Sequence, residues 1–469
     1  MDTSHLAKPR LIPLWQWAEH ATHPVLMDKG QPITADQLRQ RAADWAKTMA
    51  LTPGARVAVY HTDLFECLAI LMAVWASHAT ACIPGDACEV TQQRLSQTVD
   101  RFVGTFSEHP STAPNAGDAG EPLNHAWPPE YPAIEIYTSG STGAPKPIQK
   151  TLGQLFDEIT ALETLWPTHK GTVVLGSVSH HHFYGLMFRV LWPLCSSRPI
   201  ERAMCTFTED IFQWSGLYDE YHLISSPTHL SRINPELDWP SRQGRCSMIV
   251  SAAAPLTRDD SLSAKRYLGC PVNEIYGSSE TGAIAWRVQQ EERADQPWQP
   301  TPGSLIDQED DGRLRVRAPF IREGVLSLAD QIAFCEDRPH AFTLQGRADR
   351  IVKLEGKRIS LTAIERTLLA HPEIAEVKAL ILKRKRDEIA IVAELTASGL
   401  AALNGQSRRA FTQHLMRPLM DQFEAVARPR RWRFVTSLPT NEQGKITQHA
   451  LEALFDGETP AEPQLREAL

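Results

Sequence analysis

A strand–helix–strand pattern over residues 54–84 constrains the fold of this chain more than any other feature. The apolar run ARVAVYH (55–61) predicts a strand, LFECLAILMAVWASH (64–78) a buried helix, and TACIPG (80–85) a second strand. Two strands joined through a helix run parallel in one sheet, because the crossover returns the chain to the same edge. The pattern therefore predicts an α/β fold.

Further short apolar runs continue this alternation along the chain. Strands are predicted in TVVLGSV (172–178), HLISS (222–226), SMIVSAAAPL (247–256) and VNEIYGSSE (272–280), with helical patterns between them. Several end in small residues, and α/β sheets bind ligands at the carboxyl ends of their strands. From about residue 303 polar and apolar residues alternate, as in GRLRVRAPFI (312–321). This change predicts short antiparallel strands.

Composition favours a folded, multidomain protein without nucleic acid as its partner. The 469 residues are 42% hydrophobic and 22% charged, with a formal net charge of −8, whereas nucleic-acid binders usually carry a basic footprint. The eight cysteines form no C-x-x-C pair, which predicts buried thiols in a reducing compartment. The N-terminus lacks an apolar leader, and the run 64–84 contains Glu66 and His78. We therefore expect no membrane span and a cytoplasmic location.

The stretch YTSGSTGAPKPIQKT (137–151) is a loop rich in glycine and hydroxyl residues. Backbone N–H groups of such a loop can surround an anion, and Lys146 would add a positive charge. The spacing is not that of a Walker A loop, because Gly143 is followed by Ala-Pro-Lys. Composition alone leaves two interpretations open, a phosphate-binding loop and a disordered linker.

A second loop, NEIYGSSETGAIAW (273–286), again ends a predicted strand with glycine and hydroxyl residues, and it adds Glu280. A carboxylate beside a phosphate loop is where Mg²⁺ would bridge protein and nucleotide oxygens. The alternative is a serine-hydrolase elbow, G-x-S-x-G, but its last position here is Thr281. The two loops together favour nucleotide binding.

These loops and four further segments resemble the motifs of the adenylate-forming enzymes, the superfamily of acyl-CoA synthetases, adenylation domains and luciferases. The matching segments, in family order between roughly residues 25 and 451, are YTSGSTGAPK, VSHHHFYGL (178–186), SAAAPL (251–256), YGSSETG (276–282), GRADRIVKLEGKRISLTAIE (346–365) and LPTNEQGKITQHAL (438–451). The resemblance implies a large N-terminal domain (1–346) of stacked βα sheets with a small β-barrel-like subdomain. It also implies a small, mobile α+β C-terminal domain (347–469).

The resemblance implies a two-step reaction with ATP and Mg²⁺. A carboxylate attacks the α-phosphorus of ATP and releases pyrophosphate, and a thiol then takes the acyl group from the adenylate. The residues expected to bind ATP are Thr138, Ser139, Gly140, Ser141, Thr142, Gly143, Lys146, Ala253, Ala254, Glu274, Tyr276, Gly277, Asp330 and Arg347. Tyr276 could instead be a core aromatic, Asp330 a turn residue and Arg347 part of a surface ion pair.

The catalytic residues implied by the family are Lys445, Glu280 and Ser279, with Glu280 holding Mg²⁺. Ser279 stands where the family more often has threonine, and Ala253 and Ala254 replace frequent glycines. Asp330 lacks the Thr-Gly that usually precedes it. By the same resemblance, Asp349 is the hinge of the C-terminal domain, and Gly356 and Arg358 face the tunnel of the incoming thiol.

The acid pocket is expected around His182, Phe183, Tyr184 and Gly185, whose mixed character suits a small aromatic or hydroxylated acid. A metal site in the run 180–182 is not favoured, because on a strand only alternate side chains share a face and no other ligand cluster is nearby in the sequence.

The short length and Pro147, where the family usually has glycine, resemble the ligases of aryl-polyene and xanthomonadin-type pigment clusters. That likeness implies loading of a hydroxybenzoate-like acid onto the phosphopantetheine of an acidic acyl carrier protein. The segment 347–469 carries more Lys and Arg than Asp and Glu, which suits such a partner or forms a solvated basic face. Free coenzyme A is the alternative acceptor, and a catalytically inactive nucleotide-binding relative is a more distant alternative.

Overall fold

A computed structural model describes residues 11–118, 121–137, 147–169, 171–292, 296–354, 357–384, 387–423, 425–440 and 446–456. The chain divides into two compact units. The first comprises Met1–Asp307, Arg315–Ser327 and Phe334–Thr343, and the second comprises Gln308–Leu314, Leu328–Ala333 and Leu344–Leu469. The expected domain boundary after residue 346 remains a prediction.

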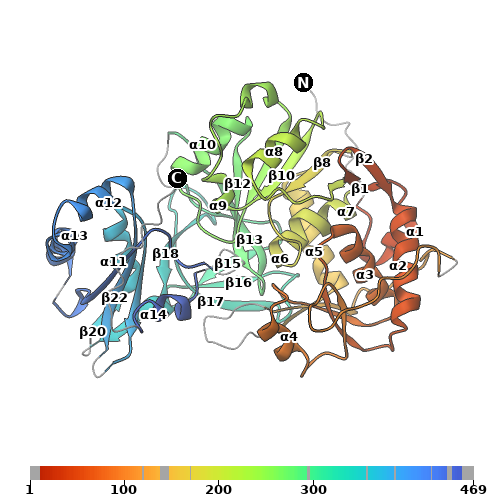
Figure 1. Ribbon diagram of the computed structural model, residues 1–469, viewed down its shortest axis with the longest axis horizontal. Helices are drawn as coiled ribbons and strands as arrows, with labels where there is room; N and C mark the ends of the chain where they lie inside the picture. Colours follow the sequence, from red (N-terminus) through yellow and green to blue (C-terminus); the bar gives the residue numbers. More distant parts are fainter. Residues whose placement is uncertain are drawn as a thin grey trace. The chain divides into compact units, whose positions relative to one another are not determined.

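A nine-stranded sheet is the largest element of the first unit, and its strands come from distant parts of the sequence (Figure 1). The strands, in spatial order, are β14 (Gln299–Pro300), β13 (Gly282–Val288), β12 (Val272–Ser278), β11 (Cys246–Ser251), β10 (Tyr221–Ser225), β8 (Val173–Gly176), β9 (Ile200–Glu201), β1 (Pro24–Asp28) and β2 (Gln31–Thr34). The four predicted strands are β8, β10, β11 and β12, and they pair in parallel as neighbours. Their carboxyl ends therefore share one edge of the sheet.

A second sheet of the first unit confirms the parallel pairing predicted for residues 54–84. Its order is β5 (Arg101–Gly104), β3 (Arg56–Tyr60), β4 (Thr80–Ile83), β6 (Pro132–Tyr137) and β7 (Pro147–Thr151). β3 and β4 are parallel and are joined by α3 (Leu64–Ala76). The Asp63 side chain caps α3 by accepting a hydrogen bond from the Glu66 amide, which fixes where the strand gives way to the helix.

Alternating side chains of β8, β10 and β11 point into two different cores. Leu175, Leu223 and Ile249 pack with α8 (Thr208–Ser215), α9 (Pro227–Leu230) and α10 (Arg258–Leu268). Val174 and Ile224 instead pack into the larger core, which contains α3, α5 (Leu152–Leu165), β3 and β6. Because neighbouring residues of a strand face opposite ways, the sheet is buried on both faces, as parallel sheets are.

The described part of the chain contains further helices and two smaller sheets. The helices are α1 (Trp17–His20), α2 (Ala35–Met49), α4 (Glu89–Leu95), α6 (Phe183–Gly185), a π-helical segment (Leu186–Leu191), α7 (Trp192–Cys195), α11 (Leu361–Leu369), α12 (Ala397–Asn404), α13 (Arg408–Gln422) and α14 (Gln448–Ala453). A four-stranded sheet has the order β15 (Leu305–Gln308), β16 (Arg313–Arg317), β17 (Val325–Phe334) and β18 (Phe342–Arg347). β19 (Ile351–Leu354) pairs with β20 (Lys357–Ser360).

The second unit contains a three-stranded sheet with helices on both faces. It is formed by β21 (Ile374–Leu382), β22 (Glu388–Leu395) and β23 (Arg431–Val435). Ile389 and Ile391 pack with α11 and α13 on one face, whereas Ala390 and Val392 pack with α14 on the other. Figure 1 draws this α+β arrangement in blue. The predicted fold class is confirmed.

All eight cysteines are free thiols, and six are buried, while Cys88 is exposed and Cys335 is half-buried. Within the described ranges, no helix is both long enough and apolar enough to cross a bilayer.

Candidate active site

The carboxyl edge of the nine-stranded sheet gathers several residues predicted from separate sequence motifs. His182–Gly185 follow β8, Ala253 and Ala254 follow β11, and Ser279 and Glu280 follow β12. The parallel order β8-β10-β11-β12 brings these loops to one edge, since parallel strands end on the same side. This edge is the candidate active site of the first unit.

The turn between β12 and β13 is held by hydroxyl groups and requires glycine at both ends. The Ser278 amide donates to Thr281 Oγ1 at 2.9 Å, and the Thr281 hydroxyl donates to the Gly282 carbonyl at 2.9 Å. A Cβ on Gly277 would lie 2.0 Å from the Gly282 carbonyl oxygen, so only glycine fits there. The strands thereby reverse within a few residues and present Ser279 and Glu280 at the tip.

The Glu280 side chain is exposed at this tip, whereas Ser279 is half-buried. Within the described part of the chain, no hydrogen bond or ion pair engages the Glu280 carboxylate, although Lys150 holds the backbone carbonyl of the same residue. An exposed carboxylate on a braced turn fits the hard oxygen ligand that Mg²⁺ prefers. The residue type and its geometry are therefore compatible with the predicted metal role.

Two other predicted nucleotide residues on β12 are engaged in side-chain contacts. Glu274 is buried and accepts hydrogen bonds from Arg287 at 2.9 Å and from Gln289 at 2.8 Å. The Tyr276 ring lies 5.5 Å from that of Trp298 and 6.3 Å from that of Phe342. Glu274 thus links β12 to Arg287 on β13. Tyr276 is part of an aromatic cluster with Trp298 and Phe342 near the carboxyl end of β12.

The loop after β11 has an unusual backbone. Ala253 is exposed and has φ of +76°, a region that residues with a Cβ seldom adopt. Its neighbour Ala254, also exposed, lacks this conformation. The family resemblance places frequent glycines at these two positions, and the positive φ gives a physical reason for glycine at position 253.

The predicted acid-pocket residues after β8 are largely buried. The Tyr184 hydroxyl lies 3.0 Å from the Ser225 carbonyl and 2.9 Å from the Val250 carbonyl, and burial raises the Tyr184 pKa well above its ordinary value. A Cβ on Gly185 would lie 2.0 Å from the Ser179 carbonyl oxygen, and Phe183 is 7% exposed. Tyr184 therefore joins the ends of β10 and β11 from the acid-pocket side.

The histidine run 180–182 differs from the sequence-based picture in two ways. The residues lie in a turn after β8 rather than on a strand, and Cys67 approaches His180 and His181 within metal-ligand range. However, His181 Nε2 accepts the His61 amide hydrogen bond at 3.2 Å, and its Nδ1 lies 3.2 Å from Ser179 Oγ. Both ring nitrogens of His181 are thus occupied, and the pair forms a buried hydrogen-bonded network.

The predicted phosphate loop leaves the second sheet at the end of β6. Residues Thr138, Ser139, Gly140, Ser141, Thr142, Gly143 and Lys146 lie outside the described residues. On the N-terminal side of this loop, Arg56 donates hydrogen bonds to Glu135 at 2.6 Å and to Tyr137 Oη at 3.0 Å. These contacts fix the last residues of β6. After the loop, β7 leads directly into α5, whose N-cap Thr151 forms a capping box with Gln154.

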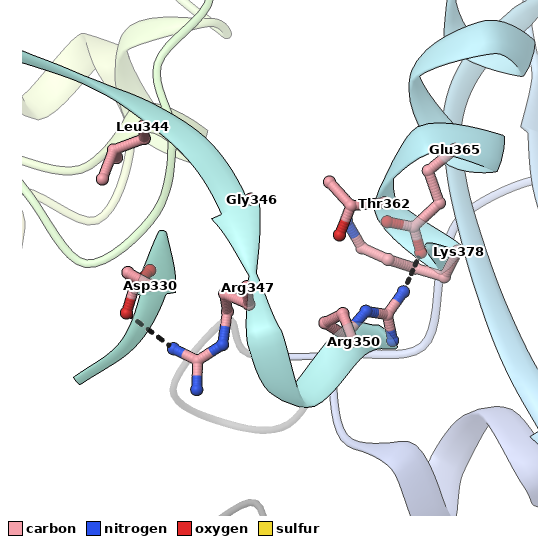
Figure 2. Close-up of a pocket in the computed structure, with 8 residues that line it drawn as sticks. All are labelled: Asp330, Leu344, Gly346, Arg347, Arg350, Thr362, Glu365 and Lys378. Carbon is pink, nitrogen blue, oxygen red and sulfur yellow. Dashed lines mark hydrogen bonds and ion pairs between the residues drawn. The ribbon is translucent and has the colours of Figure 1, made fainter. Parts of the chain in front are cut away.

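Asp330 and Arg347 meet in the second unit. Arg347 Nη1 lies 3.2 Å from Asp330 Oδ2, and Figure 2 shows the two side chains pointing toward one another among the residues that line a pocket. The other pocket-lining residues are Leu344, Gly346, Arg350, Thr362, Glu365 and Lys378. The structure therefore brings together two residues predicted from separate motifs to contact the nucleotide.

Four predicted residues of the second unit lie, wholly or in their side chains, outside the described part of the chain. Gly356 and Lys445 lie outside the described residues. Asp349 is in a short 3₁₀ helix (Ala348–Arg350) and Arg358 is on β20, but their side chains also lie outside the described part. Their roles stay predictions.

Lys150 is a site residue that the sequence analysis did not single out. It is 1% exposed, and its ammonium group donates to the carbonyls of Glu280 at 3.0 Å and Phe320 at 2.7 Å. Only its position in the sequence could have indicated this contact. Lys150 follows the predicted phosphate loop, on a short strand that leads directly into α5. A lysine at such a position indicates either a solvent-facing side chain or a buried contact, and the sequence does not decide between them.

Comparison with known proteins identifies the family. Residues 85–319 match the model of the AMP-binding enzyme family, and the chain belongs to it. A 4-coumarate–CoA ligase of Cereibacter sphaeroides is 28% identical over 66% of this chain and 69% of its own. A p-hydroxybenzoic acid–AMP ligase, FadD22, of Mycobacterium marinum is 24% identical over 92% of this chain and 66% of its own.

A solved structure supports the same fold. The ATP-bound MatB of Rhodopseudomonas palustris superposes with a TM-score of 0.76, at 16% identity, and the match covers 95% of this chain and 99% of that one.

Proposed function

We propose that this protein is an acid–thiol ligase that activates a carboxylic acid as its acyl-adenylate and then transfers the acyl group to a phosphopantetheine thiol. Membership of the AMP-binding enzyme family supports the nucleotide step. The observation that carries the proposal is the β12–β13 turn, which presents the exposed Glu280 carboxylate at the carboxyl ends of the parallel strands β8, β10, β11 and β12.

The electrostatics of the first step explain why these residue types are needed. Two anions, the acid and the triphosphate, must approach each other, so positive charge and backbone N–H groups have to face them. We assign this role to the loop 138–146 and to Lys445, with Mg²⁺ on Glu280 neutralising phosphate charge. In this proposal Asp330 contacts the ribose and Arg347 contacts the ribose or a phosphate. Asp349 is the hinge of a C-terminal domain that begins at 347.

The acid is proposed to be small and aromatic, such as a hydroxybenzoate. Two relatives carry names with aromatic acids, 4-coumarate and p-hydroxybenzoic acid. The segment 182–185 would line the pocket with Phe183 and His182 beside the well-packed Tyr184. A bulky, buried wall of this kind suits a compact ring better than a long alkyl chain.

The acceptor is proposed to be an acyl carrier protein, in keeping with the resemblance to aryl-polyene pigment ligases. The support is an arginine cluster in the second unit, formed by Arg384, Arg408, Arg431 and Arg433. Desolvation and the charges of the other three lower the pKa of Arg433. Within the described ranges, only Arg431 of the four bonds an acid, Glu388, and the others contact backbone carbonyls. Such unneutralised charge suits an acidic partner.

Coenzyme A is the competing acceptor, because the Cereibacter relative is named as a CoA ligase. ATP–pyrophosphate exchange with a panel of benzoates, cinnamates and alkanoates tests the first step. Incubation of the enzyme, ATP and the best acid with holo-carrier protein or with coenzyme A, read by intact mass, tests the second. Exchange with aromatic acids and a mass shift on the carrier protein are expected. No exchange with any acid contradicts the proposed function, and acylation of coenzyme A alone contradicts only the proposed acceptor.

A further inference from the structure

Lys150 links β7 of the five-stranded sheet to the β12–β13 turn of the nine-stranded sheet. It lies on β7, directly after the predicted phosphate loop, and its ammonium group reaches the carbonyl of Glu280 on the β12–β13 turn. The same group bonds the Phe320 carbonyl, so one side chain holds two backbone segments that are remote in sequence. The ammonium group also lies 5.8 Å from the ring of Phe183, in the predicted acid pocket.

The charge on Lys150 is costly to bury, which argues that its contacts matter. Desolvation lowers the Lys150 pKa, and the nearby carboxylates of Glu158, Glu323 and Glu280 oppose that shift in part. Glu158 is itself 1% exposed, and its Oε1 accepts the Ala283 amide hydrogen bond at 3.0 Å. An uncharged residue would avoid this desolvation if the site needed only packing. Two buried side chains therefore hold the β12–β13 turn, Lys150 at the Glu280 carbonyl and Glu158 at the Ala283 amide.

We propose that Lys150 is a positioning residue that fixes Glu280 through its backbone carbonyl, and so sets where the Glu280 carboxylate meets the magnesium–nucleotide. This inference rests on the proposed function, since it assigns Glu280 to the metal. A misplaced turn would leave the fold intact but move the carboxylate away from the metal. Small displacements of catalytic groups cost large factors in rate.

The test compares Lys150→Met with wild type in ATP–pyrophosphate exchange at varied Mg²⁺. We expect the exchange kcat to fall about 10- to 100-fold and the Mg²⁺ concentration for half-maximal exchange to rise, while KM for the acid stays unchanged. Lys265→Met is the matched control, because Lys265 is half-exposed on α10 and should behave as wild type. Lys150→Arg retains donors for the two carbonyls and should recover part of the loss.

A double-mutant comparison separates positioning from general destabilisation. If Lys150 acts through Glu280, then Lys150→Met should cost little further exchange activity in a Glu280→Gln background. Hydrogen–deuterium exchange of Lys150→Met should be faster than that of wild type in peptides covering residues 276–284. In β1 and β2 the two proteins should exchange at the same rate. The inference is overturned if the losses of pyrophosphate exchange in the two single variants add fully in the double variant. It is also overturned if hydrogen–deuterium exchange at 276–284 is the same in Lys150→Met as in an active wild type. Wild type that is inactive with every acid overturns the proposed function, and the positioning role with it.

Discussion

Gly282 packs directly against the buried carboxylate of Glu158. Its φ is +68°, and a Cβ built on it would lie 2.5 Å from Glu158 Oε2. Glu158 Oε1 meanwhile accepts a hydrogen bond from the next amide along the chain. The turn that presents Glu280 therefore requires glycine at position 282 for two reasons. The backbone has a positive φ, and the Glu158 carboxylate occupies the space that a Cβ would need.

Gly282→Ala should destabilise the first unit by about 2–3 kcal/mol, through strain in the left-handed region and displacement of Glu158. Chemical denaturation measures this loss. Gly303→Ala is the matched control, because Gly303 has a similar φ of +82° but its Cβ would meet nothing closer than 3.7 Å. Equal losses in both variants would show that the Glu158 contact contributes nothing.

Ala253→Gly should stabilise the protein by about 0.5 kcal/mol. Relief of the positive φ gains about 1–2 kcal/mol, and the added freedom of glycine in the unfolded chain offsets about 0.4–1 kcal/mol of it. Ala254→Gly, at the adjacent position without a positive φ, should instead lose stability. Denaturation midpoints of the two variants check the prediction, and a destabilised Ala253→Gly would contradict it.

Acidification should destabilise the fold through the buried histidine pair. Burial lowers the pKa of His180 to about 4 and that of His181 to about 2, from an ordinary 6.5. Below pH 6.5 the unfolded chain therefore binds protons that the native state does not, so stability falls by about 1.4 kcal/mol per pH unit for each histidine. The free energy of unfolding, measured between pH 7.5 and 5, reports this slope.

His181→Asn keeps an acceptor for the His61 amide but cannot titrate, so its loss between pH 6.5 and 5 should be about 2 kcal/mol smaller than that of wild type. His20→Asn, at an exposed histidine, is the control. A His181→Asn slope identical to that of wild type would show that this histidine is not held neutral by the fold.

Lys445→Ala should reduce ATP–pyrophosphate exchange by at least about 100-fold, because the proposed function assigns this lysine to the negative charge that develops on the α-phosphate. The thermal midpoint should stay within a degree or so of wild type. Lys383→Ala, at an exposed lysine in the same unit, is the control. Exchange retained by Lys445→Ala would remove this lysine from the first step.

The sequence determined the order of the elements and the location of the candidate site in the chain. The parallel pairing of β3 and β4 and of β8, β10, β11 and β12 follows from apolar runs separated by helices, which depend on residues a few positions apart. Glycine and hydroxyl residues likewise identified the turn at 277–282, because turn geometry is local.

The tertiary structure decided which side chains support that turn. Lys150 reaches carbonyls 130 and 170 residues away, and Glu158 occupies the space beside Gly282, contacts that no local pattern encodes. The environment of His180–His182 likewise could not be predicted from these residues alone. Their neighbours His61 and Cys67 come from the end of β3 and from α3. Periodicity reports on a residue and its neighbours in sequence, whereas the partner of a buried charge is set by how two sheets pack together and exclude water.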